Sequence, residues 1–107
     1  MPLDKIDQAR RDMLMQAAGV LDSMRVMGAV DDASALRNTR EFLAGRQAPT
    51  DGTVPAEVVR AAETERAWVL GTIEDALAGK GAPSGLGPLA WAERQFQERV
   101  WPFMMNG

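Results

Sequence analysis

Few side chains in this sequence could perform chemistry. The chain contains no histidine and no cysteine, so a general acid or base would be a carboxylate and a metal site would consist of oxygen ligands. Two adjacent acidic pairs, Asp31–Asp32 and Glu74–Asp75, are the candidates. Neighbouring residues on a helix point in different directions, so these pairs suit capping or solvated roles better. We therefore predict no catalytic residue, no metal site, no cofactor and no enzyme activity.

One short group of polar residues could contact nucleic acid, because arginine and asparagine on a helix that follows a turn can reach base edges. The group consists of Arg37, Asn38, Arg40 and Arg46. Asp31, Asp32 and Glu41 flank it, and the formal net charge of the chain is −3. A nucleic-acid binder normally concentrates basic residues on one face. We therefore expect no direct binding to duplex DNA.

The strongest functional candidate is a C-terminal run of six apolar residues, from Val100 to Met105. Chain ends are usually polar and frayed, so this run needs a role. One hypothesis is that it folds back and caps the core of the chain itself. The other is that its aromatic side chains fill pockets on a larger partner protein. The docking hypothesis assigns partner contact to Trp91, Phe96, Val100, Trp101, Phe103 and Met104, with Trp101 and Phe103 as the anchors.

An apolar stripe near the start of the chain predicts self-association. It advances by alternating steps of three and four and consists of Leu3, Ile6, Met13, Ala17, Val20, Met24 and Met27, with Arg10 as an interruption. A repeat averaging 3.5 residues is typical of helices packed side by side. Leu14 and Leu21 widen the apolar face beyond what one partner helix covers. We therefore predict a homo-oligomer.

Four helices must position these residues. Helical spacing and cap residues predict helices at 3–27, 31–44, 54–78 and 89–101, with a hinge rich in glycine and proline at 79–88. Asp31 or Asp32 should cap the second helix, and Gly45 should end it. Pro102 should disrupt the last turn of the fourth helix.

The third helix carries two irregularities. Glu65 and Arg66 interrupt its apolar stripe partway along. Gly71 lies in its interior and costs about 1 kcal/mol relative to alanine. A neighbouring helix that approaches the backbone closely would explain this glycine.

The predicted fold is all-α, because strand-forming residues are scattered and helix formers dominate. We expect a single domain over residues 1–107, built as a small bundle of about four helices. Helices 3–27 and 54–78 should form a long antiparallel hairpin, and the hinge should uncouple the C-terminal helix from the rest. No stretch approaches the roughly 20 apolar residues of a membrane span, and charges stand where a signal peptide needs an apolar run. We expect a cytoplasmic protein without a membrane partner.

These observations together favour a non-enzymatic helical adaptor or regulatory subunit that associates with itself and docks a larger protein. Two other functions fit a similar pattern. The first is an oligomeric component of a phage-like DNA-packaging assembly, with a helical core of the kind found in small terminase subunits. The second is a carrier for a small apolar ligand, because six of the seven methionines lie in the first helix or the C-terminal run.

Overall fold

The structure is a computed structural model that describes residues 4–27, 31–45, 54–80 and 85–105. These ranges hold four helices: α1 (Lys5–Val26), α2 (Asp32–Ala44), α3 (Ala56–Leu77) and α4 (Pro88–Met105). The described ranges contain no strand, so the predicted all-α bundle is confirmed. Within them, none of the helices is long and apolar enough to cross a membrane.

Aspartate side chains start the first two helices. The carboxylate of Asp4 accepts a hydrogen bond from the backbone N–H of Asp7 at 2.7 Å, and that of Asp31 accepts one from Ser34 at 2.8 Å. Each bond satisfies a backbone donor that has no partner within the helix. The predicted cap at Asp31 and the predicted end at Gly45 are both confirmed.

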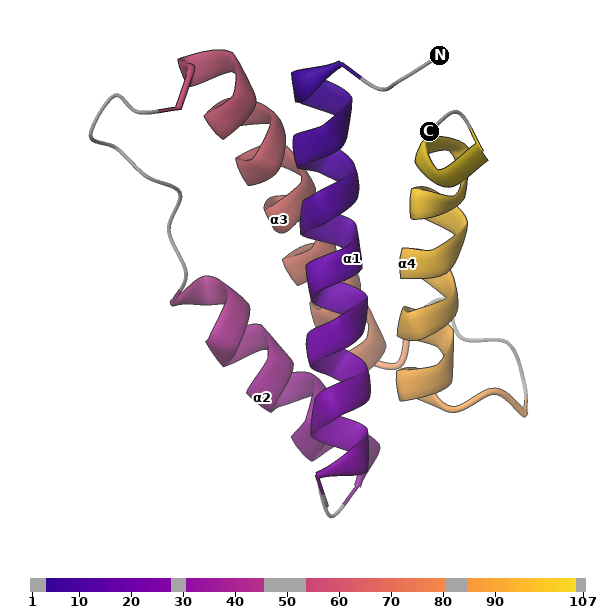
Figure 1. The fold of residues 1–107 in the computed structure, drawn as a ribbon. Helices are drawn as coiled ribbons and strands as arrows, with labels where there is room; N and C mark the ends of the chain where they lie inside the picture. The colour runs from indigo at the N-terminus through magenta and orange to yellow at the C-terminus, as the bar shows by residue number, and fades with distance from the viewer. Residues whose placement is uncertain (1–3, 28–30, 46–53, 81–84, 106–107) are drawn as a thin grey trace.

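Consecutive helices run in alternating directions, so the two long helices α1 and α3 run parallel (Figure 1). The start of α1 and the start of α3 lie side by side and border a shallow, open hollow of ≈ 340 Å³, lined by Lys5, Gln8, Ala9, Asp12, Val54, Pro55 and Val58. The predicted antiparallel hairpin of 3–27 with 54–78 is therefore wrong. The reason is that α2 carries the chain back toward the start of α1 before α3 begins.

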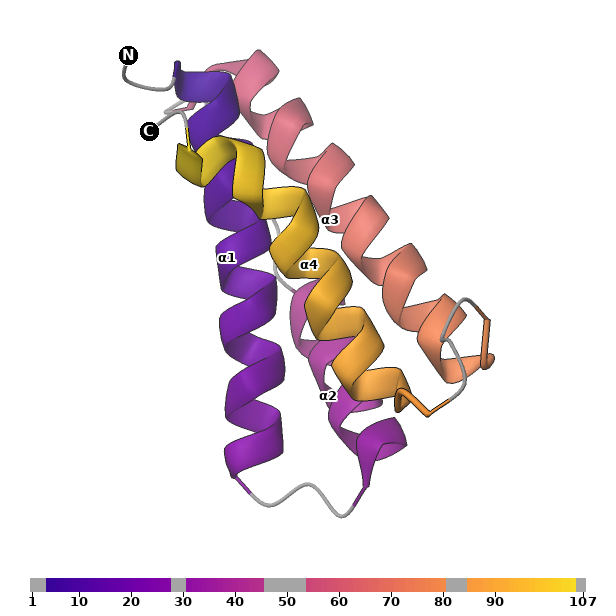
Figure 2. The ribbon, with the colours of Figure 1, turned by 90° about the vertical axis from the view of Figure 1, so that its right-hand side faces the viewer.

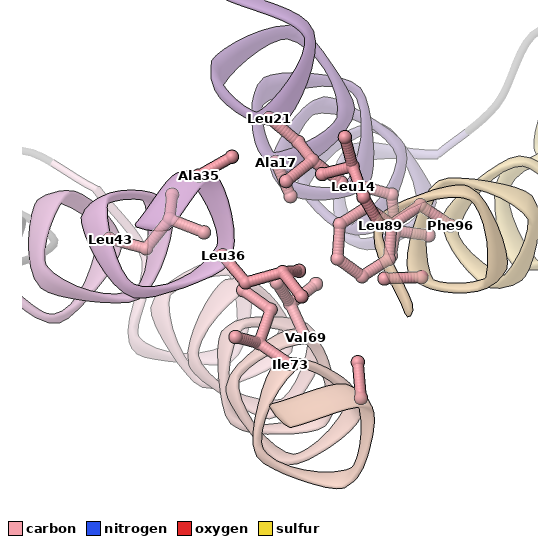
Figure 3. Packing of buried hydrophobic residues seen from close by; sticks show 12 residues of the cluster. Leu14, Ala17, Leu21, Ala35, Leu36, Leu43, Val69, Ile73, Leu89 and Phe96 are labelled. Atoms are coloured by element: carbon pink, nitrogen blue, oxygen red, sulfur yellow. The ribbon is translucent and has the colours of Figure 1, made fainter. Parts of the chain in front are cut away.

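The core draws on all four helices (Figure 3). Its buried apolar residues are Leu14, Ala17 and Leu21 of α1, Ala35, Leu36 and Leu43 of α2, Val69, Ile73 and Ala76 of α3, and Leu89, Ala92 and Phe96 of α4. Each helix contacts the other three. The ring of Phe96 is fully buried and meets Trp68 edge-on, with 6.0 Å between the ring centroids.

The C-terminal helix is part of this core. Two glycines that precede it, Gly79 and Gly85, adopt φ angles of 77° and 87°, which favour glycine. The apolar side of α4 nevertheless packs against α1, α2 and α3. The prediction that the hinge uncouples α4 is therefore wrong, because Leu89, Ala92 and Phe96 tie the helix to the bundle.

Helix α4 also continues beyond its predicted end at residue 101, through Pro102 to Met105. Proline leaves the backbone carbonyl of Glu98 without its helical donor. Glu98 and Pro102 are both exposed, so water can take the place of that donor. Pro102 thus lies inside the helix instead of disrupting its last turn.

Two glycines inside helices have open space around them. A Cβ atom added at Gly19 of α1 or at Gly71 of α3 would meet no other atom within 4 Å, and both residues are exposed. The predicted close approach of a neighbouring helix to Gly71 is therefore absent from the described part of the chain.

Candidate functional site

A buried carboxylate joins α1, α3 and α4. The side chain of Glu65 in α3 is 0% exposed, and its Oε1 accepts a hydrogen bond from Arg10 Nε of α1 at 2.8 Å. Arg99 of α4 donates from Nε to Oε2 at 2.6 Å and from Nη2 to Oε1 at 3.3 Å. We call Arg10, Glu65 and Arg99 the charge cluster.

The charge cluster keeps Glu65 ionised. Burial raises the pKa of Glu65, but hydrogen bonds and charge attraction from Arg99 and Arg10 outweigh it, so the pKa lies below its ordinary value. Both carboxylate oxygens are occupied by these two partners. We interpret Glu65 as a structural residue, because a carboxylate held in this way is a poor proton acceptor.

Each arginine of the charge cluster also packs on an aromatic ring from another helix. The guanidinium carbon of Arg10 lies 4.9 Å from the centroid of Phe103, and that of Arg99 lies 4.3 Å from the centroid of Trp68. Such contacts are attractive because the ring face carries partial negative charge. The last turns of α4 are thereby fixed to both α1 and α3.

The sequence held a signal for this cluster. Arg10 interrupts the apolar stripe of one long helix and Glu65 interrupts that of the other. Opposite charges that interrupt two apolar faces are expected to meet, because a buried charge requires a partner. Neither interruption by itself identifies its partner, and no pattern in the sequence singles out Arg99.

The C-terminal run divides into two sides. Val100 and Phe103 pack against the core, as the capping hypothesis expects. Trp101, Met104 and Met105 are 61%, 50% and 67% exposed, and their spacing of three and one places them together on a side of the helix that is turned toward solvent. We call Trp101, Met104 and Met105 the exposed apolar turn.

The predicted docking residues are distributed in the same way. Trp101 and Met104 are exposed, whereas Trp91, Val100 and Phe103 are partly buried against the core. Phe96 is fully buried. Its assignment to a docking surface is therefore wrong, since no partner can reach its ring while the bundle stays folded.

The exposed apolar turn ends a longer exposed strip on α4, which we call the outer seam. It advances by steps of four, three, four and three through Ala90, Arg94, Gln97, Trp101 and Met104, all of them exposed. In Figure 2 this helix lies nearest the viewer and no other helix covers it.

Glu98 beside the seam accepts a hydrogen bond from Arg94 at 3.1 Å. Gln97, Glu98 and Trp101 line a shallow hollow of ≈ 310 Å³.

The predicted self-association stripe of α1 is divided between core and surface. Ala17 is buried, Met13, Val20 and Met24 are partly buried, and Ile6 and Met27 are exposed, while Leu3 lies outside the described residues. The buried face of α1 is centred on Leu14, Ala17 and Leu21 instead. Self-association through this stripe stays a prediction.

The structure describes three of the four predicted nucleic-acid residues, and all three lie on α2. Arg40 of α2 forms an ion pair with Glu74 of α3, with 2.6 Å between Nη1 and Oε1. Arg37 and Asn38 are exposed, and Arg37 donates to the hydroxyl of Ser34 on its own helix. Arg46 lies outside the described residues. The positive charge of Arg40 is thus offset by a neighbouring acid.

Among the residues that the structure describes, no group of three or more acidic side chains could hold a metal ion. Comparisons with protein-family models, with curated proteins and with solved structures find no match to this chain. The geometry at the C-terminal end of α4 is therefore the basis for a functional proposal.

Proposed function

We propose that this chain is a non-catalytic interaction module that docks a partner protein through the exposed apolar turn. The observation that supports the proposal is the exposure of Trp101, Met104 and Met105 side by side on one helical turn. Isolated apolar residues on a surface are normal, but grouped ones mark interaction sites. Burying one such side chain contributes about 1.5–3 kcal/mol.

The other side of the same turn supports the proposal, because it holds the docking residues in place. Phe103 lies against Arg10, and Arg99 binds Glu65. Binding usually costs free energy to order the contact residues. A turn that is already fixed to α1 and α3 avoids most of that cost.

Trp101 is the expected anchor. Tryptophan is enriched among the few residues that dominate interface energies, and Trp101 borders the hollow that it shares with Gln97 and Glu98. These two polar side chains can form hydrogen bonds at the edge of the contact. We expect Trp101→Ser to weaken binding by about 2 kcal/mol or more, which corresponds to roughly a 30-fold loss of affinity.

Photocrosslinking in cells that produce the chain tests the proposal. A photoreactive benzoylphenylalanine in place of Met105 should form a protein adduct, and Trp101→Ser in the same chain should remove it. The matched control carries the photoreactive residue in place of Glu57, an exposed residue of α3. If the adducts from position 105 are no more abundant than those from position 57, the proposal is wrong.

A further inference from the structure

We propose that the outer seam of α4 binds the outer seam of a second copy of this chain, with the two helices antiparallel. This inference rests on the proposed function, because it names the protein that covers the same surface. It differs from self-association through α1, which the apolar stripe of that helix predicts.

The first support is the near symmetry of the seam about Gln97. Ala90 and Met104 lie seven residues on either side of it, and Arg94 and Trp101 lie three and four residues away. An antiparallel two-fold pair therefore brings Gln97 against itself, Trp101 against Arg94, and Met104 against Ala90. In such an interface each contact occurs twice.

The second support is the chemistry of these pairs. A guanidinium group stacks well on an indole ring, so Arg94 of one copy suits Trp101 of the other. Methionine opposite alanine joins a large side chain to a small one, which allows the helices to approach closely. Two glutamine amides at the axis can donate to and accept from each other.

The third support is charge. Arg94 and Glu98 are well exposed and lie one turn apart on α4. In an antiparallel pair centred on Gln97, the two Glu98 side chains approach each other beside the axis, and Arg94 of each copy comes near Glu98 of the other and offsets their charge. In a parallel pair, Arg94 would face Arg94 without an acid between them. Like charges in contact disfavour that arrangement.

Single cysteines test this register cleanly, because the chain contains no cysteine of its own. A disulfide requires Cα atoms about 4.4–6.8 Å apart. Mild oxidation of purified Gln97→Cys should therefore give a covalent dimer. Met104→Cys alone should not, since two residues 104 would lie about 21 Å apart along the helices. A mixture of Ala90→Cys and Met104→Cys chains should again give dimers.

The mass in solution supplies the second measurement. Light scattering should report twice the chain mass of 11.6 kDa at high concentration. Trp101→Ser should return the mass to that of one chain. Met15→Ser, which alters an exposed methionine of α1, should leave the dimer intact. Circular dichroism should confirm that both variants remain helical.

Several results would overturn this inference. One is a mass of one chain at all concentrations up to about 1 mM. A second is a Met104→Cys dimer as strong as the Gln97→Cys dimer, which would indicate a parallel pair. A third is a dimer from Val20→Cys but not from Gln97→Cys, which would place self-association on α1. If the chain is monomeric yet position 105 still captures another protein, only the second-copy inference fails. If the chain is monomeric and position 105 also captures no more protein than position 57, the proposed function fails as well.

Discussion

Replacing Arg99 by methionine should lower the free energy of unfolding by about 3 kcal/mol. The change removes both hydrogen bonds from Arg99 to Glu65 and leaves a fully buried carboxylate with Arg10 as its partner. Removing one member of a buried ion pair costs about 3–5 kcal/mol. The lower end of this range applies, because the Arg99 side chain is one-third exposed. Water can therefore replace part of the hydrogen bonding that Glu65 loses. Methionine keeps an unbranched chain over Trp68.

The matched control replaces Arg10, Glu65 and Arg99 together by methionine. No buried charge then remains, so the free energy of unfolding should return to within about 1 kcal/mol of the unsubstituted chain, or exceed it. Urea unfolding at pH 7, followed by circular dichroism, measures all three proteins. A loss below about 1 kcal/mol for Arg99→Met, or a triple variant that is less stable than the single one, would contradict a stabilising role for the Arg99–Glu65 contact.

Acid should reduce the effect of the same substitution. The pKa of Glu65 is lowered in the folded chain, so its stabilising contribution is present above the ordinary pKa of an unfolded glutamate and is lost as pH falls through the lower pKa of the folded chain. Below that pH, Glu65 is neutral and no longer requires Arg99. The difference in unfolding free energy between the unsubstituted chain and Arg99→Met should therefore shrink from pH 7 to pH 3, and a constant difference would contradict this assignment.

Three further outcomes are expected. Gly19→Ala and Gly71→Ala should each raise the free energy of unfolding by about 1 kcal/mol in urea titrations, because an added Cβ meets nothing within 4 Å; a loss would reveal an unseen contact. Phe96→Ala should lower it by about 3–5 kcal/mol, since that ring is fully buried, and a change near zero would contradict the core. Fluorescence anisotropy should detect no binding to random duplex DNA tighter than about 10⁻⁶ M at physiological salt.

The helices themselves could be predicted from the sequence because their signals are local. Asp31 and Gly45 bound α2, as predicted from residues within one turn of each end. The direction of α3 relative to α1 depends on how many times the chain reverses its direction between the two helices. The spacing of apolar residues within each helix does not reveal that number. The dense glycines before α4 favour a free hinge. The apolar series Leu89, Ala92 and Phe96 decided the packing instead.

The candidate site could be predicted only in part from the sequence. The C-terminal run could be identified, but its division into two sides depends on the angular position of each residue around the helix. The docking hypothesis places the whole C-terminal run on one apolar surface, but Trp101 and Phe103 are two residues apart and lie on nearly opposite sides of a helix. The structure buries part of Phe103 and exposes Trp101. The charge cluster escaped prediction because Arg10 and Arg99 lie 55 and 34 residues from Glu65. No local pattern joins residues so far apart.

The charge cluster also limits which amino-acid substitutions this fold can accommodate. A neutral residue at position 65 would leave Arg10 and Arg99 facing each other without the acid that holds both. Loss of either arginine would leave a buried acid half paired. Single replacements at these positions should therefore destabilise the fold, whereas simultaneous exchange for apolar residues should not. Homologues of this chain should accordingly keep the acid and both arginines together or lack all three.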